Sequence, residues 1–245
     1  MNNKHPIENA MVLAAGLGTR MRPITKTIPK PLVRVDGKTL LDHALDALGE
    51  AGIKRASVNV HYLADQIENH VKARGRPEIL ISDERQELLD SGGGVKQAIS
   101  KFTDGSFIIL NSDSFWIDRG ESNLNKMLSA WDPDKMDMLL LVCPKEKAVG
   151  FEGPGDFFIN EASRLTRRGK EKAAPTIYAG AIIAKSQCFH AIEQKKFSLN
   201  PMFDRAISEK RLYGVVLDGL WLHVGTPAAI GEAEMAIAKF RQEGE

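Results

Sequence analysis

The chain has 245 residues and a nearly even charge balance, with 33 Lys and Arg against 32 Asp and Glu. This length allows a sizeable core, and the balance excludes nucleic-acid or membrane binding driven by bulk electrostatics. No apolar run could span a membrane, no signal-peptide core stands at the N-terminus, and Cys143 and Cys188 lie far apart in the sequence. We therefore expect reduced cysteines and a cytoplasmic protein.

A glycine-rich loop follows the first predicted strand, which spans residues 11–14. Gly16 and Gly18 allow the backbone to turn sharply, and consecutive N–H groups in such a loop can hold phosphate oxygens. Arg20, Arg22, Lys26 and Lys30 follow the glycines with no acid among them. The sequence therefore predicts a loop that binds a polyphosphate.

Two better-known phosphate motifs do not fit this loop. A P-loop requires Lys-Ser or Lys-Thr after the glycines, and neither stands there. A dinucleotide-binding loop requires a third glycine, where Met21 stands, and then a helix. Prolines at 23, 29 and 31 exclude a continuous helix, so the loop is expected to stay extended over its ligand.

Strands and helices alternate through the rest of the first half. The predicted elements are a strand at 32–35, a helix from Leu40 to Gly52, a strand at 55–60, a helix at 63–73, a strand at 78–82, a helix after the glycines at 92–94 and a strand at 107–110. This alternation predicts an α/β fold with a mixed, mostly parallel sheet and helices on both faces. Ligands bind outside the carboxyl ends of such strands, so the glycine loop and Asp113 are expected to converge.

The second half of the chain is less regular. Its predicted elements are a strand at 138–142, a loop at 144–155, strands at 157–159 and 177–183, and helices that begin at Asn200-Pro201 and Thr226-Pro227. We expect residues 1–245 to form one domain because no linker is evident. The nucleotide-binding half covers about residues 1–115, and about residues 116–245 form a smaller part over the sheet edge.

The stretch LAAGLGTRMRP…PKPL, which begins at Leu13 and ends at Leu32, resembles the signature G-x-G-T-R-x-x-P…P-K-P-L of the sugar-1-phosphate nucleotidyltransferases. LLDSGGGVKQAI, ILNSDSFW, YAGAII and WLHVGTP extend the resemblance over nearly the whole chain. Within this family the chain looks most like the N-acetylmuramate 1-phosphate uridylyltransferases. The resemblance implies a Rossmann-like sheet of the nucleotide-diphospho-sugar transferase type, with a small sugar-binding subdomain in the second half.

The resemblance also implies a reaction in which a sugar 1-phosphate attacks the α-phosphorus of a nucleoside triphosphate and pyrophosphate leaves. Arg20 is expected to contact the β- and γ-phosphates, Lys30 the transferred phosphate, and Asp113 a magnesium ion. These three are the predicted catalytic residues. Positioning and electrostatic stabilisation supply most of the catalysis in such chemistry, and the planar Arg20 guanidinium suits phosphate oxygens.

The same resemblance implies two sets of binding residues. The nucleotide-binding set is Leu13, Ala14, Ala15, Gly16, Gly18, Thr19, Arg20, Glu87 and Gly92. Glu87 is its expected base reader, and since a carboxylate accepts from uracil and guanine alike, the base stays open. The sugar-binding set is Asn111, Asp156, Gly180 and Asn200. Many relatives bind the sugar phosphate with the lysine of a V-E-K-P motif that is missing here, and the candidates to replace it are Arg167, Arg168, Lys170 and Arg205.

The metal site departs from the family pattern at one position. The second metal aspartate, within W-x-D-x-G-T-P, is His223 in this chain. Because Mg²⁺ prefers oxygen ligands, we expect Asp113 and the triphosphate oxygens to hold the ion, with His223 outside its first coordination shell. Asp218 is the alternative source of a second carboxylate.

The predicted function is uridylyl transfer from UTP to N-acetylmuramate 1-phosphate, or to the 1-phosphate of a similar amino sugar, in cell-wall recycling. One alternative is a guanylyltransferase acting on mannose 1-phosphate or a heptose 1-phosphate. Another is a nucleotide-sugar sensor that binds without turnover. The expected partners are a nucleoside triphosphate and a sugar 1-phosphate, with no nucleic acid and no membrane. The sequence does not predict the oligomeric state.

Overall fold

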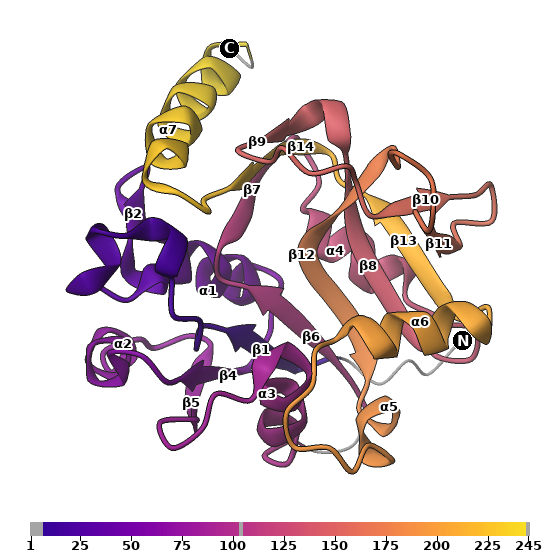
Figure 1. The fold of residues 1–245 in the computed structure, drawn as a ribbon, viewed down its shortest axis with the longest axis horizontal. Coiled ribbons are helices and arrows are strands. Elements are labelled where there is room, and N and C mark those ends of the chain that lie inside the picture. The colour runs from indigo at the N-terminus through magenta and orange to yellow at the C-terminus, as the bar shows by residue number, and fades with distance from the viewer. Residues whose placement is uncertain (1–6, 103–104, 244–245) are drawn as a thin grey trace.

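A computed structural model of the protein describes residues 7–102 and 105–243 (Figure 1). Residues 1–6, part of the N-terminal stretch on which the cytoplasmic expectation rests, lie outside the described residues. Across the described residues, no helix has the length and apolar character needed to cross a membrane. Both cysteines are free thiols, as expected from their separation.

A central mixed sheet runs through both halves of the chain, with nine strands in its described part. Along the sheet the order is β11-β10-β12-β6-β1-β4-β5, while β8 pairs with β12 and β13 pairs with β8. The strands are β1 (Asn9–Leu13), β4 (Arg55–Val60), β5 (Glu78–Asp83), β6 (Ser106–Asn111), β8 (Met138–Pro144), β10 (Phe157–Ile159), β11 (Leu165–Arg167), β12 (Thr176–Lys185) and β13 (Leu212–Val216).

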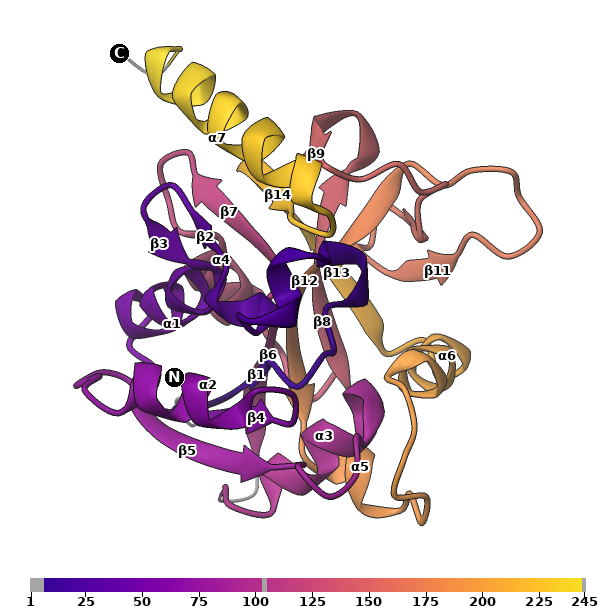
Figure 2. The same cartoon turned by 60° about the vertical axis from the view of Figure 1, so that its left-hand side comes forward.

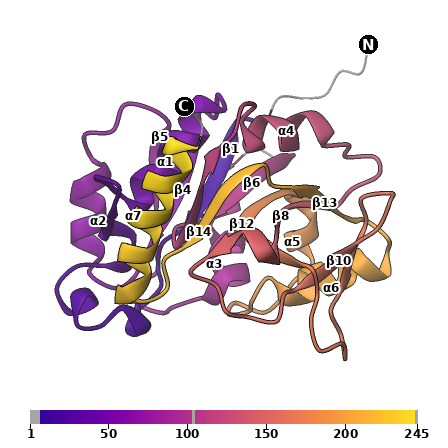
Figure 3. The ribbon, with the colours of Figure 1, turned by 90° about the horizontal axis from the view of Figure 1, so that it is seen from above.

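The first-half strands β6, β1, β4 and β5 are parallel to one another, whereas β12 runs antiparallel to both β6 and β8. Helices cover both faces, as α4 and α6 show on opposite sides of the sheet (Figure 3). The predicted α/β class, with a mixed sheet between helices, is confirmed. The second half continues the sheet of the first half through β12, β8 and β13.

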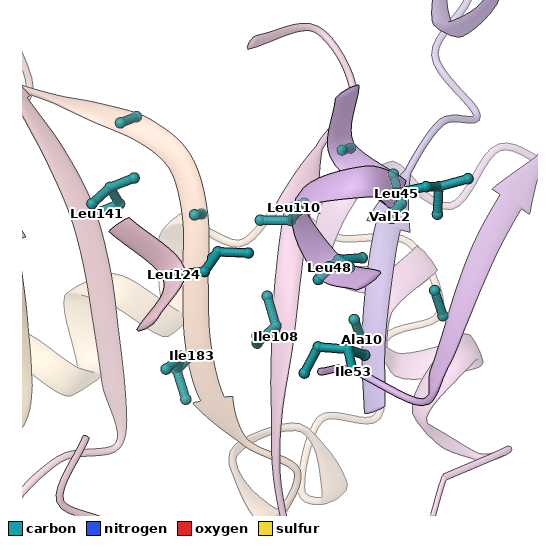
Figure 4. Close-up of a cluster of buried hydrophobic side chains, with 14 of the residues drawn as sticks. Ala10, Val12, Leu45, Leu48, Ile53, Ile108, Leu110, Leu124, Leu141 and Ile183 are labelled. Atoms are coloured by element: carbon teal, nitrogen blue, oxygen red, sulfur yellow. The ribbon is translucent and has the colours of Figure 1, made fainter. Parts of the chain in front are cut away.

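Alternating side chains along the strands build one apolar layer on each face of the sheet. Ala10 and Val12 of β1 face Leu45 and Leu48, as Figure 4 shows, in the layer under α1 (Leu40–Glu50), α2 (Ala64–Val71) and α4 (Asn123–Ala130). Met11, between them, faces the opposite layer under α3 (Asp90–Ile99), α5 (Gln187–His190) and α6 (Asn200–Ser208). Packing in these two layers holds the strands in position, and with them the carboxyl ends from which the glycine loop and the Asp113 segment begin.

A second, three-stranded sheet lies above the carboxyl end of β6. It consists of β7 (Ser114–Asp118), β14 (Gly219–His223) and β9 (Ala148–Val149). The last helix, α7 (Pro227–Gln242), begins at the predicted Thr226-Pro227, and it extends away from the main body in Figure 2. The remaining pair is the hairpin β2 (Arg34–Val35) and β3 (Lys38–Thr39). The small sheet brings the end of β14 beside the residues that follow β6.

Two local expectations were wrong. The glycine loop is not extended throughout, because it contains single 3₁₀ turns at Thr19–Met21, Ile24–Lys26 and Lys30–Leu32. Prolines prevent a long helix but are compatible with the first positions of one short turn. In addition, α3 begins at Asp90, so the glycines at 92–94 lie inside the helix and not before it.

Candidate active site

A cavity of about 530 Å³ opens at the carboxyl ends of β1, β4, β5 and β6. A volume of this size suits a nucleotide-sized ligand. As expected, the glycine loop and the end of β6 meet there. The predicted residues that line the cavity are Leu13, Ala14, Ala15, Gly16, Gly18, Thr19, Arg20, Lys30, Asn111 and Asp113.

The loop folds back on itself at Gly18, and this places Lys30 in the cavity. Gly18 has a φ of 60°, and a Cβ there would lie 3.0 Å from Lys30 Cβ and 3.1 Å from Thr25 Cγ2. The Thr25 hydroxyl donates a 2.7 Å hydrogen bond to the Gly18 carbonyl, and Tyr62 Oη donates to the Thr25 carbonyl at 2.9 Å. Only glycine combines this backbone conformation with so close an approach.

Lys30 and Asp113 form an ion pair inside the cavity. Lys30 Nζ lies 2.9 Å from Asp113 Oδ2, and the Lys30 side chain is only 12% exposed. Burial acts to raise the pKa of Asp113, but the neighbouring His223 imidazole and Lys30 ammonium outweigh it and hold this pKa well below its ordinary value. The Asp113 carboxylate is therefore charged at neutral pH and is suited to bind a cation.

His223 approaches the same carboxylate from β14. The antiparallel pairing of β14 with β7 sets His223 opposite Ser114, and His223 Nε2 lies 3.8 Å from Asp113 Oδ2. His223 Nδ1 donates to the Gly150 carbonyl at 3.1 Å, which fixes the ring orientation. Asp218 precedes the other end of β14 and binds Lys126 Nζ at 3.1 Å, away from Asp113. Among the described residues, no group of three or more His, Cys, Asp or Glu side chains gathers as a metal site.

Two residues of the predicted nucleotide-binding set lie outside the lining of this cavity. Glu87 is on the surface, where its Oε2 accepts from Lys195 Nζ at 2.6 Å. The N–H groups of Gly92 and Gly93 donate to the Phe197 carbonyl at 2.8 and 3.0 Å. These glycines therefore dock the segment 195–199, because a Cβ on Gly92 would overlap the Phe197 ring.

Three of the four residues predicted to bind the sugar lie outside the lining of the cavity. Gly180 lies behind Asn111, since a Cβ there would lie 3.3 Å from Asn111 Cβ. Asp156 Oδ2 accepts from the Tyr178 backbone N–H at 2.9 Å, and Asn200 Oδ1 accepts from Arg167 Nη2 at 2.9 Å. Only Asn111 of the predicted sugar-binding set lines the cavity itself.

Of the four cations proposed to replace the missing lysine, three have other partners, and the fourth, Lys170, is exposed and outside the cavity lining. Arg167 also binds Asp204 at 2.8 Å, and Arg205 binds Glu209 at 2.9 Å. Arg168 donates to the carbonyl groups of Gly155 and Glu171. The cavity instead has a cation that the sequence did not single out, Lys196.

Further lining residues were absent from the predicted binding sets, namely Asn59, Glu84, Leu88, Asp90, Ser91, Ser112 and Gly225. Lys196 stands in a stretch with several charges, EQKKF, where nothing in the spacing marks it. Asn59 and Glu84 did leave a signal, because each is a polar residue at the carboxyl end of a predicted strand.

Residues 9–152 match the nucleotidyl transferase family, and this match covers more than half of the chain. The chain belongs to that family. A nucleotidyltransferase of known activity, the N-acetylmuramate alpha-1-phosphate uridylyltransferase of Caulobacter vibrioides, is 42% identical over 94% of this chain and 97% of its own length. The D-glycero-alpha-D-manno-heptose 1-phosphate guanylyltransferase of Aneurinibacillus thermoaerophilus is 25% identical over 94% of this chain and 99% of its own.

Solved nucleotidyltransferase structures share the fold. The crystal structure of HddC from Yersinia pseudotuberculosis complexed with GMP-PN superposes with a TM-score of 0.73 and 21% identity, over 94% of this chain and 100% of that chain. A UDP-glucose pyrophosphorylase complexed with UDP-glucose also gives 0.73, at 19% identity over 96% of this chain and 99% of that chain. The family and the sheet topology together identify this protein as an enzyme of the nucleotidyltransferase class.

Proposed function

We propose that this nucleotidyltransferase transfers UMP from UTP to N-acetylmuramate 1-phosphate and releases pyrophosphate. The observation that carries the proposal is the 42% identity to the Caulobacter vibrioides uridylyltransferase, which extends over 94% of this chain. The cavity supports it with a glycine loop, cations and a carboxylate, Asp113, at the strand ends. In this reaction a phosphate oxygen of the sugar 1-phosphate bonds to the α-phosphorus, and the bond to the β-phosphate oxygen breaks.

The chain supplies positioning and charge for this displacement, and the reaction requires no protein nucleophile. Backbone N–H groups of residues 15–19 hold phosphate oxygens, while Arg20 contacts the β- and γ-phosphates and the departing pyrophosphate. Lys30 lies deeper in the cavity and stabilises the charge on the transferred phosphate. Its position against Gly18 is fixed before substrate arrives, so little reorganisation is needed.

Asp113 fits a divalent cation, and we assign it to Mg²⁺. The carboxylate is ionised, faces the cavity, and has room beside it for phosphate oxygens. One protein carboxylate completed by phosphate and water oxygens is a usual site for Mg²⁺. When bound, the ion neutralises phosphate charge. His223 Nε2 lies 3.8 Å from Asp113 Oδ2, and we place it outside the first coordination shell of the ion.

The choice between uracil and guanine is tested by measuring how much each nucleotide protects the protein against thermal unfolding. A ligand that binds the native state raises the melting temperature according to its affinity. We expect UTP with Mg²⁺ to raise the Tm more than GTP does at equal concentration. A greater effect of GTP would instead favour the guanylyl alternative, to which the Aneurinibacillus thermoaerophilus relative points. Pyrophosphate release, measured over a panel of triphosphates and sugar 1-phosphates, then tests the whole proposal.

Lys196 is our candidate for the cation that binds a substrate phosphate in place of the missing family lysine. It lines the cavity, whereas its neighbour Lys195 binds Glu87 on the surface. We expect Lys196→Ala to raise the KM for one of the two anionic substrates about tenfold, the effect of losing one charged contact.

The matched control is Lys195→Ala, which removes the same charge from the adjacent position, outside the cavity lining. It should change either KM by less than about twofold, because exposed ion pairs contribute little. Equal effects of the two variants would show that the segment acts only through its net charge, and would contradict the assignment of Lys196.

A further inference from the structure

A buried chain of hydrogen bonds connects two walls of the cavity. The Ala14 N–H donates to Asn59 Oδ1 at 2.6 Å, Asn59 Nδ2 donates to Glu84 Oε1 at 2.7 Å, and the Leu89 N–H donates to Glu84 Oε2 at 3.0 Å. Asn59 is 3% exposed and Glu84 2% exposed. The chain therefore joins the start of the glycine loop, the ends of β4 and β5, and the start of α3.

The direction of each hydrogen bond is fixed by chemistry. A backbone N–H can only donate, so the Asn59 oxygen must face Ala14 and its amide nitrogen must face Glu84. The Leu89 N–H donates to the other oxygen of Glu84. Both Glu84 oxygens are therefore acceptors. Across the described residues, no ion pair is formed by the buried Glu84 side chain, and its polar contacts are these hydrogen bonds.

The surrounding packing reserves space for this pair. A Cβ on Gly94 of α3 would lie 2.6 Å from Glu84 Oε1 and 2.8 Å from Asn59 Nδ2. The third glycine of the 92–94 run thus gives α3 room to approach the pair. Ala14 opens the glycine loop, while Asp90 and Ser91, just after Leu89, line the facing wall.

We infer that Asn59 and Glu84 are positioning residues that set the spacing between the glycine loop and the start of α3. The inference rests on the proposed function only in that the cavity between these two walls binds the nucleotide. Neither residue is assigned to the reacting atoms. Their effect on the reaction is exerted through the backbone at Ala14 and Leu89.

The test uses an exchange of the two functional groups. Glu84→Gln replaces one acceptor oxygen with an NH₂ group, which must then face another donor, either the Asn59 amide or the Leu89 N–H. Asn59→Asp sets two carboxylates against each other. The double variant N59D/E84Q restores every bond, because the carboxylate introduced at position 59 accepts from the Ala14 N–H and from the new amide, whose oxygen accepts from Leu89. Net charge is the same in the double variant as in the native chain.

We expect each single variant to lower the Tm by about 5 °C and to raise the KM for UTP about tenfold, with a smaller change in kcat. The double variant should recover most of both losses. A purely structural role would lower the Tm and leave the KM for UTP near its native value, and this result would overturn the inference. A double variant no better than the worse single variant would also overturn it.

Two further measurements keep the test independent of folding and of the proposed reaction. If a single variant fails to fold, Gly94→Ala replaces it, because the added methyl group on α3 crowds Asn59 and Glu84. The folded Gly94→Ala protein should have a raised KM for UTP, and an unchanged KM in this variant contradicts the inference. If the native chain transfers no UMP, the proposed function fails. Nucleotide protection in thermal melts still decides the inference, since the network predicts weaker protection in each single variant and restored protection in N59D/E84Q.

Discussion

Lys30→Ala is expected to lower kcat by a factor of about 100 or more, the scale of losing one preorganised charged contact to a transition state. The structure adds a reason for so large an effect, because Lys30 is mostly buried and its position is fixed against Gly18 before substrate binds. Steady-state pyrophosphate release at saturating substrate measures the change. The KM values should change much less than kcat, since the contact strengthens as charge develops on the transferred phosphate.

Two variants accompany this measurement. Lys30→Met keeps most of the length of the side chain and should lose as much activity as Lys30→Ala, because the charge is what matters. Lys38→Ala removes a lysine that binds Asp46 on the surface, and it should retain native activity. Loss of the ion pair with Asp113 should lower the Tm by no more than about 4 °C. Near-native turnover in a Lys30→Ala enzyme that melts normally would remove Lys30 from the catalytic set.

Asp113→Asn should abolish metal-dependent turnover, because the amide keeps the shape of the side chain but removes the negative charge that binds Mg²⁺. His223→Ala should lose much less activity, since we place the imidazole outside the first coordination shell of the ion. His223→Asp adds a second carboxylate and should lower the Mg²⁺ concentration that gives half-maximal rate. Titration of the initial rate with Mg²⁺ for the native enzyme and the three variants measures these differences.

Replacing Mg²⁺ with Mn²⁺ tests whether His223 lies outside the first coordination shell of the ion or is a direct ligand. Imidazole nitrogen is a better ligand for Mn²⁺ than for Mg²⁺. If His223→Ala is as damaging as Asp113→Asn, and Mn²⁺ supports the native enzyme far better than Mg²⁺ does, then His223 is a direct ligand. Binding of Mn²⁺ to each variant, followed by electron paramagnetic resonance, gives a readout that does not depend on turnover.

The parts of the site that the sequence predicted are those held by local geometry. The glycine loop and Asp113 each follow a buried strand, and parallel strands deliver their carboxyl ends to one edge of a sheet. The strand boundaries at 55–60 were predicted as observed because polar and apolar residues alternate there, as in a strand. The start of α3 was misplaced because its glycines look like a loop when the docking of Phe197 on them is unknown.

The rest of the site depends on contacts between distant segments. Lys196 reaches the cavity only because residues 195–199 pack on Gly92 and Gly93, about a hundred positions earlier in the chain. Asn59 and Glu84 pair across neighbouring strands, and a single sequence carries no sign of which polar residues will meet. Glu87 was predicted to contact the base from its distance in sequence before the glycines at 92–94. Such a distance does not distinguish a surface carboxylate from one that lines a cavity.

The antiparallel ladder between β6 and β12 limits how this enzyme can move. Its register runs from Leu110 opposite Ala181 to Ser106 opposite Lys185, and it joins the half that carries the glycine loop to the half that follows. A hinge between the halves would have to break this ladder, whereas hinges normally use a few loop residues. A hinge at this ladder is therefore disfavoured, and amide exchange should stay slow across β6 and β12 whether or not nucleotide is bound.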